Sequence, residues 1–291
     1  MKRIKSGFTI VELLTVVAIV ALLVGVLLPA LTYVRRSAKE AQQKVQLTTI
    51  DLALTTFKND YGDYPPSDSS SHDTAQIDYC GAQKLAEALL GRDLLGFHPR
   101  SNWSATYEVW YPPDPNDRNL DERKGPYLEL ATASAFRLGK TGEHDGLFDD
   151  AAPLNEDTFV LCDVFSVRII TLANGKTVKA GTPILYYKAN TSSKNIDNQP
   201  PDFSYRIYNV YDNGVLVDIK EQKDREKYPD PDRWPLNPLS DPAPGDTFQF
   251  FYDYIRDPKI ARPWPYRPDS YILISAGSDG LYGTADDITN F

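Results

Sequence analysis

The hydrophobic pattern divides the chain near its amino terminus. Residues 13–34 contain no charged side chain. As a helix with a rise of about 1.5 Å per residue, this stretch is roughly 33 Å long, enough to cross the hydrocarbon layer of a bilayer. We therefore expect a transmembrane helix over residues 13–34.

The pattern beyond Arg36 predicts that the same helix continues in water. Apolar residues recur there at intervals of three and four among polar positions, as on one face of an amphipathic helix: Ala38, Ala41, Val45, Leu47 (or Thr48), Leu52, Leu54 and Phe57. Gly62 and Pro65-Pro66 are strong terminators. One long helix over residues 8–60 is expected, with a kink at Pro29.

The remainder reads as one short helix followed by strands. Leucines and alanines within 81–91 share one helical face. Thr158–Leu172 and Thr177–Ala189 are rich in strand-forming residues and are joined through Asn174-Gly175, a strong hairpin signal. Further strands are expected at Tyr205–Tyr211, Val215–Ile219, Thr247–Ile255 and Ser270–Ser275, where aromatic alternation suits a half-buried sheet. The fold class is α+β, a long amino-terminal helix packed on an antiparallel sheet.

Charge separates the helix from the rest. Residues 1–60 carry eight basic and four acidic side chains, whereas residues 61–291 carry 23 and 36, a net charge of −13. We expect 61–291 to form one compact α+β domain that does not bind nucleic acid or anionic lipid by itself.

Candidate chemistry in this domain is sparse. The sequence has no G-x-S-x-G, H-E-x-x-H, P-loop or C-x-x-C motif, and its three histidines are far apart, so no enzyme is expected. Cys80 and Cys162 are the only cysteines. They form either one disulfide in an oxidising compartment or two separate buried thiols.

Glu12 is the one carboxylate near the start of the apolar run. A charge at the centre of a bilayer helix costs roughly 2.5–3.5 kcal/mol, so such a residue usually has a functional partner. The alternative is a boundary residue whose side chain reaches the interface at little cost.

The junction before the apolar run does not resemble a secretory signal cleavage site, because residues 1–60 contain no A-x-A. A basic hexapeptide instead precedes Gly7 and Phe8, and Glu12 is the fifth residue from Phe8. The stretch Gly7-Phe8-Thr9-Ile10-Val11-Glu12 resembles the processing site of type IV prepilins and type II secretion pseudopilins. The resemblance implies that a prepilin peptidase removes residues 1–7 as a leader and methylates Phe8, and that Glu12 pairs with the terminal amine of a neighbouring subunit.

A glycine-rich loop near the carboxyl terminus carries Asp279, Asp286 and Asp287. Calcium takes six to eight oxygen ligands, so three carboxylates and loop carbonyls would suit it. The segment resembles the calcium loop of major pseudopilins, which implies that these aspartates are its ligands; the alternative is a solvated acidic turn. A shorter echo at Asp145, Asp149 and Asp150 is explained more simply as a similar turn than as a second ion site.

Together these motifs resemble a type II secretion system major pseudopilin. The resemblance implies a pilin-like fold, here with a strand-rich insertion at about 131–230. It implies a periplasmic pseudopilus subunit that polymerises through its helix and drives protein secretion, with one span in the bacterial inner membrane and its carboxy-terminal domain in the periplasm. Its partners would be further copies, other pseudopilins, the prepilin peptidase and the inner-membrane assembly platform. The alternatives are a type IV pilin or minor pseudopilin, and a single-span anchored binding domain or enzyme.

Overall fold

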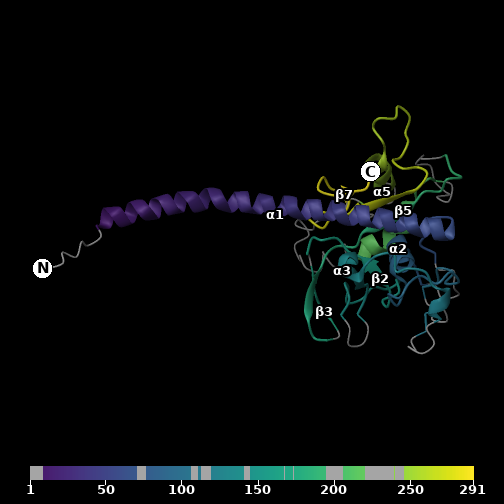
Figure 1. The fold of residues 1–291 in the computed structure, drawn as a ribbon. Helices are drawn as coiled ribbons and strands as arrows, with labels where there is room; N and C mark the ends of the chain where they lie inside the picture. The colour runs from purple at the N-terminus through teal and green to yellow at the C-terminus, as the bar shows by residue number, and fades with distance from the viewer. Residues whose placement is uncertain are drawn as a thin grey trace. The chain divides into compact units, whose positions relative to one another are not determined.

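The computed structural model describes residues 9–70, 77–105, 111–112, 119–140, 145–166, 168–172, 174–194, 206–219, 239 and 246–291. The chain divides into two compact units, Met1–Ala41 and Gln42–Phe291. Helix α1 (Ile10–Tyr61) is continuous in sequence across this division (Figure 1). The predicted long helix is therefore confirmed, and it does not end at Pro29.

None of the apolar side chains in the first half of α1 is buried within the protein. Its large aliphatic side chains are exposed, from Ile10 at 81 % to Leu31 at 42 %. Among the described residues, α1 is the one helix that is long enough and apolar enough to cross a membrane. A surface of this kind needs an apolar environment outside the folded chain.

The second half of α1 packs into the carboxy-terminal unit. The buried positions follow helical spacing: Gln43, Gln46, Leu47, Ile50, Ala53, Leu54 and Phe57. The predicted face was correct for Leu47, Leu54 and Phe57 but wrong for Ala38 and Ala41, which are exposed, and for Val45 and Leu52, which are 66 % and 69 % exposed. Two polar residues replace them on the buried face: Gln46 Nε2 donates to the Cys162 carbonyl (2.9 Å) and Gln43 Oε1 accepts from Val164 N (2.9 Å).

Helix α2 (Gly81–Leu90) confirms the predicted short helix and lies wholly in the interior. It packs on strands β2 and β5. Gly81 is required by this packing, because a Cβ there would lie 2.3 Å from the Tyr186 carbonyl oxygen. Two 3-10 turns, η1 (Leu120–Glu122) and η3 (Val210–Asp212), and the short helix α3 (Leu130–Ala133) lie in the connections.

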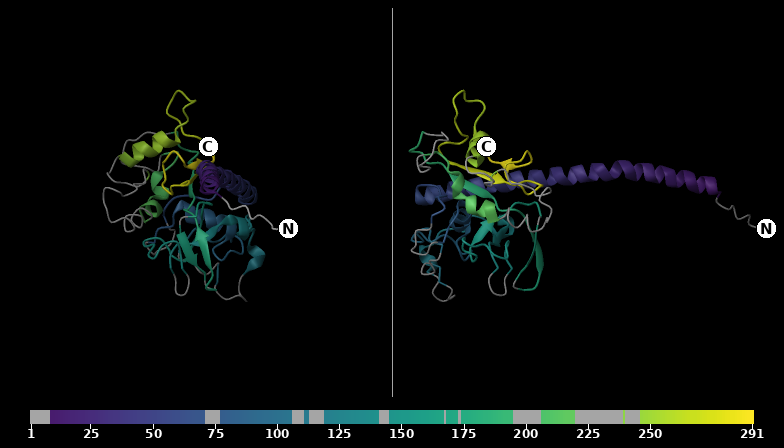
Figure 2. Two further views of the ribbon diagram at one scale, coloured as in Figure 1. Left: turned by 90° about the vertical axis from the view of Figure 1, so that its left-hand side faces the viewer. Right: turned by 180° about the vertical axis from the view of Figure 1, so that it is seen from behind.

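The described strands form three small antiparallel sheets. They are β1 (Ala135–Arg137) with β2 (Phe159–Leu161), β3 (Arg168–Thr171) with β4 (Thr177–Ala180), and the order β5 (Leu185–Lys188), β6 (Tyr271–Ser275), β7 (Ile288–Thr289). The hairpin around Asn174-Gly175 is confirmed, since Thr171 pairs with Thr177. The single sheet that we expected is wrong, because each long predicted strand is divided between two sheets. Figure 2 shows the ribbon from two further sides.

The expected strand Thr247–Ile255 is wrong, because Asp246–Ile255 is helix α5. Phe251, Tyr252 and Ile255 are buried. Their spacing of one and four residues fits one helical face as well as the alternating pattern fits a strand.

The two strands expected around Asn213-Gly214 are also wrong. Within the described residues, 210–212 form η3 and 214–219 are helical. The fully buried Asn213 accepts from Ala82 N at the start of α2 (2.8 Å) and donates to the Tyr186 carbonyl (2.7 Å). Its amide thus joins α2 to β5 instead of forming a hairpin turn.

Asp51 of α1 ties the carboxy-terminal segment to the helix. It accepts from the Tyr271 hydroxyl (2.7 Å) and from Asn290 Nδ2 (3.0 Å). Arg267 lies 3.5 Å from the same carboxylate. Asp51 therefore anchors the β6–β7 hairpin at its open end, through the start of β6 and the residue after β7.

Cys80 and Cys162 are separate, fully buried thiols in one hydrophobic cluster. Of the two alternatives from the sequence, the structure has buried thiols without a disulfide. Burial raises the pKa of the Cys80 thiol to about 12.

Candidate functional site

The start of α1 is closed by a capping box. Gly7 and Phe8 lie outside the described residues. Thr9 Oγ1 accepts from Glu12 N (3.2 Å), while Glu12 Oε2 accepts from Thr9 N (3.0 Å). This reciprocal pair satisfies two backbone donors that a helix leaves open at its amino terminus. The sequence pattern Thr-x-x-Glu carries this signal, and our sequence interpretation missed it.

The cap uses only part of the Glu12 carboxylate. The backbone N–H and the hydroxyl of Thr9 both donate to Oε2. Within the part of the chain that the structure describes, no hydrogen bond to Oε1 is present. A carboxylate oxygen can accept further bonds, so Oε1 can receive an ammonium without loss of the cap.

The acidic loop after β6 is organised around Asp286. Asp286 Oδ2 accepts from Ser278 N (2.8 Å), Ser278 Oγ (2.8 Å) and Asp279 N (3.0 Å), and Oδ1 accepts from Thr284 Oγ1 (2.7 Å). Burial raises the pKa of Asp286, but the hydrogen bonds from Thr284 and Ser278 outweigh this effect. They hold the pKa of Asp286 well below its usual range. Gly277 at φ +63° lets the backbone approach Asp286, because a Cβ there would lie 2.2 Å from the Asp286 carbonyl oxygen.

The other two aspartates have different environments. Asp279 accepts from Leu281 N (2.8 Å), and burial together with the neighbouring Asp286 raises the pKa of Asp279. Asp287 Oδ2 accepts from the Tyr254 hydroxyl and Gly283 N (both 2.7 Å). Burial raises the pKa of Asp287 to about 6.

The carboxylate oxygens of this loop are the type of ligand that a hard cation such as calcium prefers. Asp279 and Asp286 interact through their side chains, so negative charge is concentrated between them. Among the described residues, no three acidic, histidine or cysteine side chains are arranged as a metal-ligand group. Calcium ligation would therefore require the carboxylates to turn from their present hydrogen bonds toward one ion.

The three aspartates at 145–150 face separate partners. Asp145 Oδ2 accepts from Thr171 N (3.3 Å), and Asp145 lies 3.7 Å from Lys140 Nζ. Asp150 Oδ1 accepts from Ala152 N (2.9 Å), and Asp149 is exposed. These contacts are those of a turn.

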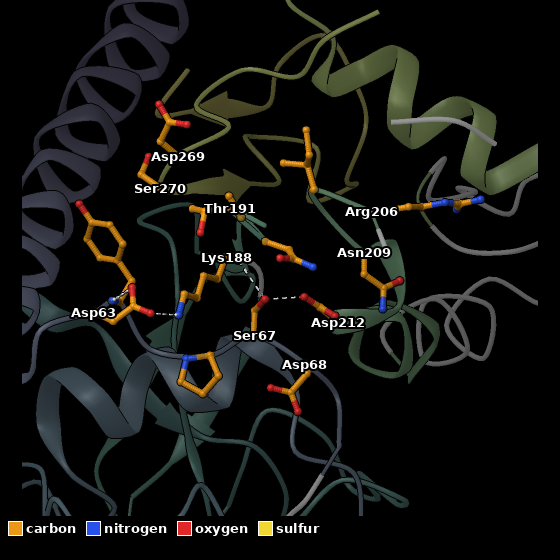
Figure 3. Close-up of a pocket in the computed structure, with 15 residues that line it drawn as sticks. Asp63, Ser67, Asp68, Lys188, Thr191, Arg206, Asn209, Asp212, Asp269 and Ser270 are labelled. Atoms are coloured by element: carbon orange, nitrogen blue, oxygen red, sulfur yellow. Dashed lines mark hydrogen bonds and ion pairs between the residues drawn. The ribbon is translucent and has the colours of Figure 1, made fainter. Parts of the chain in front are cut away.

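A cleft of about 500 Å³ opens between the loop after α1, the end of β5, the η3 segment and the residues before β6 (Figure 3). Its lining includes four aspartates, Asp63, Asp68, Asp212 and Asp269, together with Lys188 and Arg206. The sequence interpretation did not identify this cleft, because its residues come from four distant segments.

The charged groups of the cleft are largely paired with one another. Lys188 Nζ lies 2.5 Å from Asp63 Oδ2. Ser67 Oγ donates to Asp212 Oδ2 and accepts from Lys188 N (2.9 Å), as Figure 3 shows. Burial raises the pKa of Asp212 to about 7. The cleft is thus large enough for a small polar molecule. The charged side chains that line it, however, are largely paired with other groups of the protein.

No family model, curated protein or solved structure matches this chain.

Proposed function

We propose that the chain is a structural subunit of a periplasmic pseudopilus of the type II secretion kind, held in the bacterial inner membrane by α1. The observation that carries the proposal is the division of this one helix. Its first half exposes apolar side chains and carries Glu12 in its first turn, whereas its second half is built into the core of the carboxy-terminal unit. A helix of this kind can serve first as a membrane anchor and then as the polymerising element.

Pairing of Glu12 with an ammonium of another copy would drive assembly. Cleavage after Gly7 would create that amine at Phe8, and Glu12 Oε1 can receive it. Two opposite charges attract strongly where the dielectric is low, and each would be costly there alone. The pair therefore favours copies in a register that brings one amine to one carboxylate.

Calcium binding by Asp279, Asp286 and Asp287 belongs to the same proposal. The concentration of carboxylates between β6 and β7 supports it, because a divalent cation would relieve their repulsion. The ion would stabilise the segment that Asp51 anchors to α1.

The cleft in Figure 3 supports a second candidate, a single-span membrane-anchored binding domain. In that case α1 would be only a tether, and residues 1–7 would remain attached.

Mass spectrometry of the amino terminus, on protein extracted from the membrane, separates the two. The pseudopilus subunit should lack residues 1–7 and carry a methyl group on Phe8. A Gly7→Leu variant, in which the cleavage site is blocked, should retain Met1 and serves as the control. An intact amino terminus in the wild-type protein would overturn the pseudopilus proposal and favour the tether.

A further inference from the structure

The segment after α5 is an ordered hairpin of opposite charge to the unit that carries it. The basic hairpin, residues 255–266, contains Arg256, Lys259 and Arg262 against one acidic residue, Asp257. The rest of 61–291 carries 20 basic and 35 acidic side chains, a net charge of −15. In Figures 1 and 2 the loop that leaves α5 extends away from the rest of its unit.

Backbone hydrogen bonds hold this hairpin in one shape. Tyr266 N donates to the Ile255 carbonyl (2.9 Å), and Asp257 N donates to the Trp264 carbonyl (2.9 Å). Asp257 Oδ1 accepts from Lys259 N (2.9 Å), which fixes the turn. Because the backbone is already ordered, a contact made by the hairpin costs little further conformational entropy.

The cations of the basic hairpin are available to a partner. Arg256, Lys259 and Arg262 are exposed. Within the described part of the chain none of the three forms an ion pair; the guanidinium of Arg262 lies 4.1 Å from the ring centroid of Trp264. By contrast, Arg267, just beyond the hairpin, is bound to Asp51.

We infer that the basic hairpin docks on the acidic surface of a second copy of this chain. The inference rests on the proposed filament, in which copies are held side by side. Outside the hairpin, residues 61–291 carry a net charge of −15, so two such units repel one another, and the exposed group of three cations on each offers the complementary charge. A contact between a hairpin on one copy and a different surface on the next is heterologous, the kind that generates open filaments.

An anionic membrane is the other surface that would attract these cations, but the charge of the whole unit opposes it. Approach to anionic lipid would bring the 35 acidic side chains outside the hairpin toward a surface of the same sign. The second copy is therefore the favoured occupant.

Photo-crosslinking from the tip of the hairpin tests this directly. The exposed Ala261 is replaced by a photoreactive benzoylphenylalanine in the full-length chain, and ¹⁵N-labelled and unlabelled copies are mixed in the membrane. Illumination should yield crosslinked peptides that join a labelled copy to an unlabelled one. Crosslinks only within one copy, or only to lipid, would overturn the inference.

Charge reversal gives the matched comparison. Lys259→Glu with Arg262→Glu should lower the yield between copies about tenfold, since it places like charges against each other. Lys176→Glu with Lys179→Glu makes the same change of charge on the exposed β3–β4 hairpin and should leave the yield unchanged. Equal yields from the two pairs would overturn the inference. A processed amino terminus with no such crosslinks would refute the hairpin contact while leaving the pseudopilus proposal intact.

Discussion

The charge of Glu12 can be separated from its capping role, because glutamine keeps a side-chain acceptor and loses the charge. Glu12→Gln should retain the contact to Thr9 N, and Glu12→Ala should lose it. If an ammonium of another copy is the partner, both variants should insert in the membrane yet assemble poorly, which pelleting of filaments measures.

Thr9→Val is the control for the cap. It removes the Thr9 hydroxyl that accepts from Glu12 N but keeps the carboxylate. Losing a cap costs about 1 kcal/mol, which a helix buried in a bilayer can tolerate. Normal assembly of Glu12→Gln together with poor assembly of Thr9→Val would show that the cap, and not the charge, is what matters.

The Asp212 carboxyl makes stability depend on pH. Its pKa is about 7 in the folded protein and about 3.8 when exposed. Between these values the native state holds a proton that the unfolded chain has released, so the free energy of unfolding falls by about 1.4 kcal/mol per pH unit as pH rises. The loss is complete above the folded pKa and totals at most about 4 kcal/mol.

Asp212→Asn should remove this dependence. Denaturant unfolding of the full chain in detergent should give nearly equal stabilities for variant and wild type near pH 4, and a more stable variant near pH 8. Asp269→Asn, which alters an exposed carboxylate of the same cleft, should leave the wild-type profile unchanged. A wild-type curve that is flat across this range would contradict the raised pKa.

At the residue scale, what the sequence reveals depends on how local the partner is. Glu12 is conspicuous as a lone charge, and its partner Thr9 lies three residues away, within reach of pattern reading. By contrast, Asn213 Oδ1 accepts a hydrogen bond from the N–H of Ala82, which lies 131 residues away in the sequence. The sequence Asn213-Gly214 consequently predicts a turn. Only the folded chain shows that the Asn213 amide links α2 to β5.

At the scale of elements, the loop between β6 and β7 gives a test of the calcium proposal. An ion bound only by the folded state, at about 100 times its dissociation constant, adds roughly 2.7 kcal/mol of stability. The melting temperature of the full chain in detergent should rise with calcium and fall again with a chelator. Magnesium should act poorly, because it demands a tighter octahedral shell.

Asp286→Ala should abolish most of that response, since all four hydrogen bonds to its carboxylate organise the loop. Asp149→Ala removes an exposed carboxylate from the 145–150 turn and should respond like the wild type. A chain whose melting is indifferent to calcium and chelator would reduce the loop to an acidic turn held by hydrogen bonds.

Elements with one dominant local signal were predictable: α1 by its length, α2 by its leucine face and the β3–β4 hairpin by Asn174-Gly175. Helix α5 was not, because Phe251, Tyr252 and Ile255 satisfy helical and alternating patterns alike, and tertiary packing decides between them. The cleft could not be foreseen either, because it joins segments far apart in sequence. The opposite charge of the basic hairpin was present in the sequence and was overlooked.

At the scale of the whole molecule, the proposed orientation places the carboxy-terminal unit outside the cytoplasm. Ala261→Cys puts a thiol at the exposed tip of the basic hairpin, while Cys80 and Cys162 stay fully buried. A membrane-impermeant maleimide added to spheroplasts should therefore label Ala261→Cys and leave the wild type unlabelled. Labelling only after the cells are lysed would place this unit in the cytoplasm.

The two buried cysteines set a time limit on maturation. A thiol that reaches an oxidising compartment before its chain has folded is open to disulfide-forming enzymes, and any bridge would tie together groups that the native core keeps unbonded. Once α2 and β2 have closed over them, high pKa values and loss of solvent access make Cys80 and Cys162 inert. If the carboxy-terminal unit is exported as proposed, folding must outrun oxidation, and the yield should depend on the redox state of the compartment even though the folded protein has two free thiols.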